Sequence, residues 1–279
     1  MNCYFLYQCL YPKINMAEVV AGFFQGLGMA LSSYPLDTIK VRMQSGNFSS
    51  VNECIKNSFK NHGLFGFYRG VGSLIYTSPL RSSMSLALYN NARNRLKCET
   101  PFYNGIGAGA ITGGFMASIV CPIEVIKCSI QTSSQKLKTL EYAKTLYKNH
   151  GIKIFYQGLK ITLLRELVGF SVFFGTYEHM KTILVNKYQK IPSWGYFLAG
   201  SVSGVICTIS VFPIDTIKTV FQTNSSKLTY PQTVKFILSS RGALGFWKGL
   251  LPSALRSLIS FGTGFFAYEQ VKSCLLSIS

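Results

Sequence analysis

The stretch Pro35-Leu36-Asp37-Thr38-Ile39-Lys40 combines a proline with an acid two residues later and a lysine five residues later, and this motif occurs three times. The other copies are Pro122-Ile123-Glu124-Val125-Ile126-Lys127 and Pro213-Ile214-Asp215-Thr216-Ile217-Lys218, which start 87 and 91 residues further on. An internal repeat determines the architecture before any local pattern does. Each copy lies in an apolar stretch, where a charged side chain is costly and needs a partner. The chain is therefore predicted to be a triplicated unit in a membrane.

The composition agrees with membrane spans. The 279 residues are 48% hydrophobic and 14% charged, whereas an ordinary soluble domain has about 25% charged residues. Several apolar stretches are long enough for a span, which needs ~20 residues; a large soluble helical protein is the alternative interpretation. The net charge of +18 suits an anionic membrane surface or anionic solutes. No basic block is interleaved with aromatic residues, so we expect no nucleic-acid partner.

Cysteine and histidine patterns indicate neither a metal site nor a catalytic site. The eight cysteines form no CxxC pair, and the three histidines have no neighbouring ligand pattern. A membrane-embedded enzyme would need a nucleophile–base pair or a metal cluster, and neither is visible in the sequence. We therefore expect no enzyme activity, metal or cofactor. The first 15 residues resemble neither a secretory signal nor a transit peptide.

Each unit also contains two glycines four residues apart, the first of them thirteen residues before the proline. The pairs are Gly22 and Gly26, Gly109 and Gly113, and Gly200 and Gly204. Small residues at this spacing let helices approach closely in a bilayer, where packing drives association. Since the pairs recur at one offset, a close helix contact is expected at this place in every repeat.

Further repeated positions follow each proline. The first is a glutamine: Gln44, Gln131 and Gln222. The second is a glycine followed by an aromatic–polar–glycine triplet: Gly63 with Tyr68-Arg69-Gly70, Gly151 with Tyr156-Gln157-Gly158, and Gly242 with Trp247-Lys248-Gly249. The third is a tyrosine in a second apolar stretch: Tyr89, Tyr177 and Tyr268. The matches predict that each repeat has two spans with a polar connection between them.

The sequence thus predicts an all-α membrane protein, one domain of six transmembrane helices in three repeats around a pseudo-threefold axis. The expected spans are 17–45, 71–95, 104–132, 159–183, 194–223 and 250–274, in repeats at 16–98, 102–187 and 193–277 after an N-terminal extension at 1–15. Amphipathic stretches at 51–61, 140–149 and 231–240 should form short surface helices. Each proline should kink its span, because it removes one helical hydrogen bond.

The charges of the three proline motifs have two interpretations. The acid and the lysine of each motif are three residues apart, so both lie on one helix face and could form a local bridge. A ring of bridges between repeats is favoured, because unpaired charges inside a membrane bundle are costly. The ring would pair Asp37 with Lys127, Glu124 with Lys218, and Asp215 with Lys40.

A second set of charges lies near the ends of the second, fourth and sixth spans. The positions are Asn90 and Arg93, Glu178 and Lys181, and Glu269 and Lys272. We expect Glu178 to pair with Lys272 and Glu269 with Arg93. Asn90 stands where an acid is expected, so Lys181 would gain only a neutral hydrogen bond, about half as strong as a charge-assisted one. This ring should be weaker on that side.

These motifs resemble those of the mitochondrial carrier family, and the resemblance covers nearly the whole chain. It implies a monomeric, multi-pass carrier of the mitochondrial inner membrane that works by alternating access. The proline-motif ring would be the matrix gate, braced by the three glutamines, and the second ring the cytoplasmic gate, braced by the three tyrosines. The short helices would lie on the matrix side. The triplets at Tyr68 and Trp247 resemble cardiolipin-binding ends, whereas Gln157 departs from the basic residue expected there.

The charges left inside the spans are candidates for solute binding. They are Arg81, Arg165, Glu166 and Arg256, joined by Thr77 and Ser78 at the equivalent place of the second span. Arg165 and Arg256 lie thirteen residues before an acid of the second ring, which is roughly 20 Å along a helix. The alternative is a purely structural salt bridge of Glu166 with Arg165 or Arg256.

The resemblance extends to a solute class. Adjacent Arg165 and Glu166 resemble the pair found in amino-acid carriers, and residues 163–170 with Ile126-Lys127-Cys128 resemble the ornithine and carnitine carriers. A zwitterion would offer a carboxylate to an arginine, whose forked donors suit it, and an ammonium to Glu166. We therefore expect transport, uniport or antiport, of an amino acid or a related zwitterion such as ornithine, carnitine or S-adenosylmethionine.

Three alternatives remain open at this point. Thr77 and Ser78 supply no second acid and Arg81 would repel a side-chain ammonium, which favours carnitine-like, neutral or acidic solutes. A carrier of nucleotides or of keto or dicarboxylic acids is the nearest rival, although Glu166 argues against it. A non-transporting, carrier-like membrane adaptor belongs to a different class, and the largely intact charges argue against it.

Overall fold

The computed structural model describes residues 16–44, 56, 59–60, 63, 68, 72–96, 98, 100–132, 144–145, 147–148, 151–156, 158–223, 229–247 and 250–278. Six long helices dominate these residues. They are α2 (Met16–Gln44), α4 (Gly72–Leu96), α5 (Pro101–Thr132), α7 (Leu159–Tyr188), α8 (Ser193–Thr223) and α10 (Leu250–Ile278). No strand occurs among the described residues, and each long helix corresponds to one expected span within a few residues. The helices continue through Pro35, Pro122 and Pro213.

Short helices connect the long ones. The surface helix expected near 231–240 is present as α9 (Tyr230–Arg241), which begins with a capping box between Thr229 and Gln232. Two 3₁₀ helices, η2 (Ile152–Tyr156) and η3 (Ala243–Trp247), precede the next long helix in the second and third repeats. The surface helices expected at 51–61 and 140–149 lie largely outside the described residues.

The repeated glycine before each of these connections has a backbone conformation that suits glycine. Gly63, Gly151 and Gly242 have φ angles of 60°, 68° and 66°, a region that side chains with a Cβ disfavour. The N–H of each donates to the carbonyl four residues earlier, at 2.9, 2.8 and 3.1 Å. A positive-φ glycine at this position is a common way to end a helix, which explains why the glycine recurs in all three repeats.

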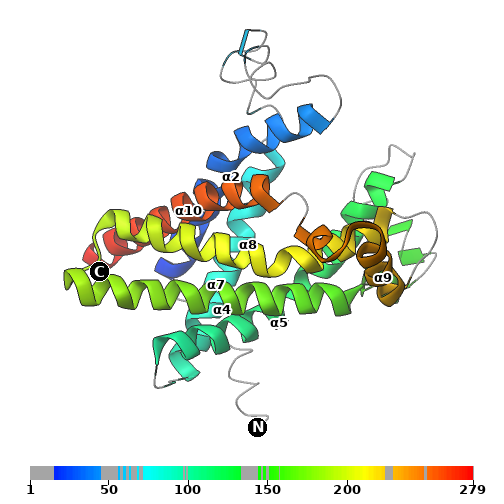
Figure 1. Cartoon of the computed structure of the whole chain (residues 1–279). Helices are drawn as coiled ribbons and strands as arrows, with labels where there is room; N and C mark the ends of the chain where they lie inside the picture. The colour runs from blue at the N-terminus through cyan, green and yellow to red at the C-terminus, as the bar shows by residue number, and fades with distance from the viewer. Residues whose placement is uncertain are drawn as a thin grey trace.

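The long helices form a closed ring in chain order. Each packs on its neighbours in the sequence, and α10 packs on α2, so the last helix closes the ring against the first. Figure 1 shows α9 at the end of the bundle opposite the C-terminus. A ring of six helices leaves an interior that side chains from several helices can line.

The distribution of polar and apolar side chains is that of a membrane bundle. Among the described residues, large apolar side chains such as Phe23, Phe24 and Leu251 are exposed, whereas Glu166, Glu178 and Ser203 are buried. Within the part of the chain that the structure describes, four stretches are long and apolar enough to cross a membrane: Met16–Leu36, Pro101–Ile123, Ser193–Lys218 and Ala243–Leu275. The α4 and α7 helices are less apolar, and they carry several of the charges that point inward.

The paired glycines lie where long helices touch. A Cβ on Gly26 would meet the backbone of Pro79, and one on Gly204 would meet the ring of Phe261. A Cβ on Gly113 would lie 2.5 Å from the carbonyl oxygen of Glu166, closer than real Cβ contacts allow. The expected close contacts are therefore present in all three repeats, between α2 and α4, α5 and α7, and α8 and α10.

The second glycine of the α5 pair has a matched control in the next residue. Gly113→Ala should lower the thermal unfolding midpoint of the detergent-purified protein, because the added methyl group pushes α5 away from the backbone of Glu166. Gly114→Ala should leave the midpoint close to that of the wild type, since a Cβ at Gly114 meets nothing within 4 Å. Equal midpoints for the two variants would contradict this account of the helix contact.

Candidate functional site

The bundle contains a partly open cavity of about 480 Å³ that is lined by polar and apolar side chains from α2, α4, α7, α8 and α10. Among the described residues, the charged members of the wall are Arg81, Arg165, Glu166, Asp215 and Arg256. Polar and ionisable groups inside a membrane bundle mark solute or ion pathways by default. The cavity is therefore the candidate functional site.

Glu166 on α7 is the centre of the charged wall. Its carboxylate accepts hydrogen bonds from Arg81 Nη2 on α4, at 2.9 Å for Oε1 and 3.2 Å for Oε2, and a further one from Arg165. Its side chain is only 4% exposed, whereas that of Arg81 is 48% exposed. The bridge thus joins two helices across the interior, and it leaves part of the Arg81 guanidinium open to the cavity.

The sequence-predicted solute residues mostly meet in this wall. Ser78, Arg81, Arg165, Glu166 and Arg256 line the cavity, whereas Thr77 is exposed and is not part of the lining. The bridge between Arg81 and Glu166 was not expected, because Arg81 was considered only as a charge that would repel an ammonium. Glu166, which Arg165 also contacts, offsets part of the charge of Arg81, so that argument against basic solutes is weaker than the sequence suggested.

Most of the uncharged wall is formed by hydroxyl-bearing side chains and by phenylalanines. The hydroxyl side chains are Ser33, Ser78, Ser82, Ser85, Thr208, Ser253, Ser257 and Ser260, and the phenylalanines are Phe170, Phe173, Phe174, Phe212, Phe261 and Phe265. Such a lining can hydrogen-bond a polar solute and also cover an apolar part of it. Of these residues, sequence reasoning selected only Ser78, because serine and phenylalanine are common in every span.

Of the proline-motif ring, the structure describes the side chains of one repeat only. Asp215 lines the cavity and Lys218 lies one turn further along α8, half-buried. The other side chains of this ring lie outside the described residues: Asp37, Lys40, Gln44, Glu124, Lys127, Gln131 and Gln222. The pairing of the ring therefore stays a prediction.

The second ring is formed. Arg93 on α4 pairs with Glu178 on α7, with 2.9 Å between Nη2 and Oε2, and Lys181 on α7 pairs with Glu269 on α10 at 3.1 Å. Tyrosines donate to the same two acids: the Tyr89 hydroxyl to Glu178 at 3.1 Å, and the Tyr177 hydroxyl to Glu269 at 2.9 Å. Each acid is thus held by a base and a tyrosine from one neighbouring helix.

The expected direction of this pairing was wrong. The sequence analysis paired Glu178 with Lys272 and Glu269 with Arg93, and it left Lys181 with a neutral partner. In the structure each base instead reaches the acid of the next even-numbered span in chain order. The reason is that the tyrosine and the base lie one turn apart on the same helix face, so both converge on one acid; repeat spacing alone fits either direction.

The position without an acid therefore faces Lys272. The Asn90 amide donates to the Tyr268 hydroxyl at 3.0 Å, and Lys272 donates to the same hydroxyl at 3.3 Å. Lys272 also lies 3.7 Å from a carboxylate oxygen of Glu18 on α2. Glu18 was not selected from the sequence, although it is one of only ten acids in the chain.

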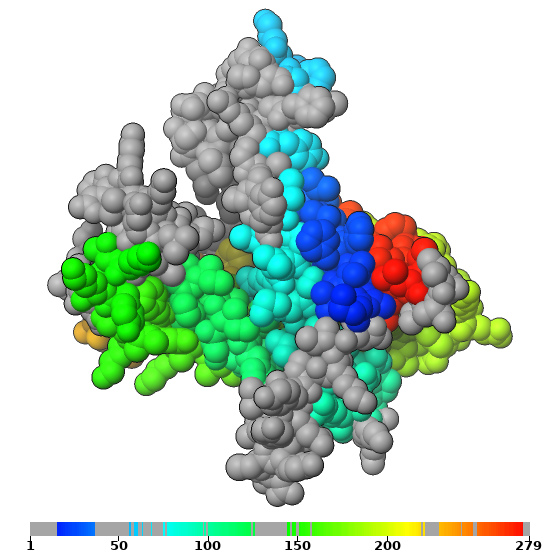
Figure 2. All heavy atoms as spheres, turned by 180° about the vertical axis from the view of Figure 1, so that it is seen from behind, coloured from blue at the N-terminus to red at the C-terminus, as the bar shows by residue number. Residues whose placement is uncertain are grey.

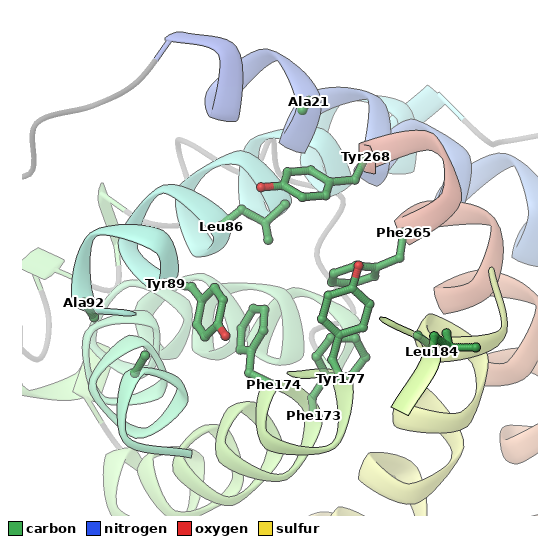
Figure 3. Packing of buried hydrophobic residues seen from close by; sticks show 12 residues of the cluster. Ala21, Leu86, Tyr89, Ala92, Phe173, Phe174, Tyr177, Leu184, Phe265 and Tyr268 are labelled. Carbon is green, nitrogen blue, oxygen red and sulfur yellow. The ribbon is translucent and has the colours of Figure 1, made fainter. Parts of the chain in front are cut away.

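A layer of aromatic rings separates the second ring from the cavity. Phe173, Phe174 and Phe265 belong both to the cavity wall and to the buried cluster that contains the bracing tyrosines. The rings of Tyr89 and Phe174 are stacked, and Tyr177 packs beside Phe265 with 4.4 Å between ring centroids (Figure 3). The cavity is therefore covered on this side first by aromatic rings and then by ion pairs.

Comparison with known proteins explains this arrangement. The family model described as "Mitochondrial carrier protein" matches residues 12–100, 98–188 and 189–279, one match for each repeat. The chain belongs to the mitochondrial carrier family. Members of this family are transporters rather than enzymes.

Individual relatives extend the family match along the chain. "Mitochondrial substrate carrier family protein S" of Dictyostelium discoideum is 30% identical and covers 92% of this chain and 96% of its own length. "Mitochondrial ornithine transporter 1" of Saccharomyces cerevisiae is 27% identical and covers 92% and 94%, and "Mitochondrial arginine transporter BAC2" of Arabidopsis thaliana is 27% identical and covers 94% and 92%.

The formed ring predicts strong coupling within each pair of this carrier. Glu178→Gln should lower the free energy of unfolding by about 1.5–3 kcal/mol, because a hydrogen bond to a charged group is worth that much. Arg93→Gln should remove the same interaction, so the double variant should be little worse than Glu178→Gln alone. The measurement is thermal unfolding in detergent, and fully additive effects would show that the two side chains do not pair.

Proposed function

We propose that the chain is an alternating-access carrier of the mitochondrial inner membrane for an amino acid or a related zwitterion. The observation that carries the proposal is a cavity wall with charged groups of both signs, three arginines and two acids among the described residues, in a carrier-family bundle. The names of the ornithine and arginine transporters among the relatives support the same solute class.

A zwitterion matches this wall in charge and in geometry. Its carboxylate can accept from Arg165 or Arg256, since guanidinium donors suit a carboxylate. Its ammonium group can approach the carboxylates of Glu166 and Asp215, and the serine hydroxyls can complete both hydrogen-bond shells. A nucleotide or a dicarboxylate would satisfy the arginines but would leave the two acids facing a negative solute.

Within this class the wall is compatible with a second cation on the solute. Asp215 places a second carboxylate in the wall on α8, and Glu166 offsets part of the charge of Arg81. Ornithine-like and arginine-like solutes are therefore candidates, as are carnitine-like and S-adenosylmethionine-like solutes. All of them share the carboxylate and the cationic nitrogen that the central charges would recognise.

Transport then requires the two rings to open in turn. The second ring, with its aromatic layer, closes one side of the cavity, so Arg93 and Lys181 must leave Glu178 and Glu269 before solute can pass there. The proline-motif ring would close the other side at that moment, by the pairs expected from the sequence. We place the second ring on the cytoplasmic side, and we expect a monomer with cardiolipin at the ends near Tyr68 and Trp247.

Exchange in liposomes tests the proposed function. The purified protein, reconstituted into vesicles, should exchange radiolabelled ornithine, arginine, carnitine or S-adenosylmethionine and should be inactive with ATP and with dicarboxylates. Glu166→Gln should reduce exchange about tenfold or more, since a hydrogen bond to a charged group is worth ~1.5–3 kcal/mol and ~1.4 kcal/mol is tenfold.

The control variant for this experiment is Lys160→Gln on the same helix, which is exposed outside the cavity and should exchange at the wild-type rate. Glu166→Asp keeps the charge and should retain more activity than Glu166→Gln. Exchange of ATP without exchange of any zwitterion would contradict the proposed solute class, and wild-type exchange by Glu166→Gln would remove Glu166 from the site.

A further inference from the structure

The two complete bridges of the second ring follow one pattern that the third position breaks. Tyr89 and Arg93 of α4 converge on Glu178, and Tyr177 and Lys181 of α7 converge on Glu269. Pseudo-threefold symmetry would bring the equivalent tyrosine and lysine of α10, Tyr268 and Lys272, onto residue 90 of α4. That residue is an asparagine, whose amide donates to the tyrosine instead of accepting from it.

We propose that Glu18, on α2, supplies the third acid of this ring. Its carboxylate lies 3.7 Å from Lys272 Nζ, so the lysine that the symmetry directs to Asn90 has a charged partner from a different helix. The proposal rests on the gating role that the proposed function gives the ring. It assigns part of that role to the first helix of the chain, which contributes no residue to the ring in the symmetric pattern.

Burial supports a gate contact rather than an incidental surface pair. The side chains of Lys272 and Glu18 are 28% and 15% exposed, close to the 24% and 13% of the complete pair Lys181 and Glu269. Fully exposed ion pairs contribute little to stability, whereas loss of one partner from a shielded pair leaves a poorly solvated charge behind. Removal of Glu18 would leave Lys272 in that position.

The placement of Glu18 also changes which helices the ring joins. Two bridges join α4 to α7 and α7 to α10, and the third joins α10 to α2, where the last helix closes the bundle against the first. Figure 2 shows the start of α2, in blue, against the end of α10, in red. Opening of the ring must therefore separate Glu18 from Lys272 at this seam, the contact between α10 and α2. Among the described polar contacts of the ring, the hydrogen bond between Asn90 and Tyr268 is the only one that joins α4 to α10.

Further along the seam the contacts are uncharged. The Thr263 hydroxyl donates to Ser32 Oγ at 2.7 Å, and Ser260 donates to the carbonyl of Met29 at 3.2 Å. Gly264 faces the Met29 side chain at close range. These contacts fix the separation of the two helices, and Glu18 adds to them a charged contact at the level of the ring.

A double-mutant cycle with a rescue variant tests the proposal. Glu18→Gln and Lys272→Gln should each lower the thermal unfolding midpoint in detergent by about 2–4 °C, the shift that ~1 kcal/mol gives in a protein of this size, and the double variant should be no worse than either alone. Asn90→Asp should restore the midpoint of Glu18→Gln, because an acid at residue 90 can take over Lys272.

Asn91→Asp is the matched control, since it adds the same charge one residue away on α4, where Asn91 already accepts from Arg95. It should not rescue Glu18→Gln. If Glu18→Gln cannot be purified from membranes, the charge swap Glu18→Lys with Lys272→Glu gives the same test. The folded protein should then be obtained from the double variant and not from either single variant. Additive single effects, equal rescue by Asn91→Asp, or failure of both rescues would overturn the proposal.

Exchange rates in liposomes separate this proposal from the proposed function. The unfolding cycle needs no solute, so coupling without any zwitterion exchange would contradict the solute class and leave Glu18 in the ring. Zwitterion exchange at the wild-type rate in Glu18→Gln, together with additive effects of Glu18→Gln and Lys272→Gln on unfolding, would contradict the role of Glu18. Those two results would leave the proposed solute class standing. Where exchange is measurable, Glu18→Gln should change its rate and Asn90→Asp should return that rate toward the wild-type value.

Discussion

The structure depends on one constraint: a charged side chain inside an apolar bundle needs an opposite charge close by. The buried carboxylates are paired with bases in two places, the cavity wall and the second ring. Glu166 is held by two arginines in the cavity wall, and Glu178 and Glu269 are held by Arg93 and Lys181 in the ring above it. Because a bridge between helices can break and re-form, the same constraint that stabilises the bundle also allows the gate that we propose.

Close helix packing makes these bridges possible. The paired glycines bring α5 against the backbone of α7 at Glu166, and the other pairs do the same for α2 with α4 and α8 with α10. Each repeat is thereby a tight hairpin of two long helices, and the hairpins enclose the cavity between them. The aromatic layer under the second ring fills the space that remains, so the ion pairs are shielded from the cavity below them.

The repeat allowed most of the fold to be predicted. The positions of the long helices, the glycine contacts and the family follow from residues that recur at one offset. The direction of pairing in the second ring did not follow, because Glu178 is compatible by spacing with either neighbour. Glu18 was missed for a related reason: it has no counterpart in the other repeats, so a search for recurring residues passes over it.

The central claim is that the polar wall of the bundle faces water inside the membrane while the opposite helix face meets lipid. In a chain whose cysteines are replaced by serine, Ser82→Cys on α4 lines the cavity and Leu80→Cys on the same helix lies among the exposed apolar side chains. Labelling of sealed proteoliposomes with a small membrane-impermeant thiol reagent measures this difference directly. The account predicts that Ser82→Cys reacts and Leu80→Cys does not; reaction at Leu80→Cys with protection at Ser82→Cys would contradict it.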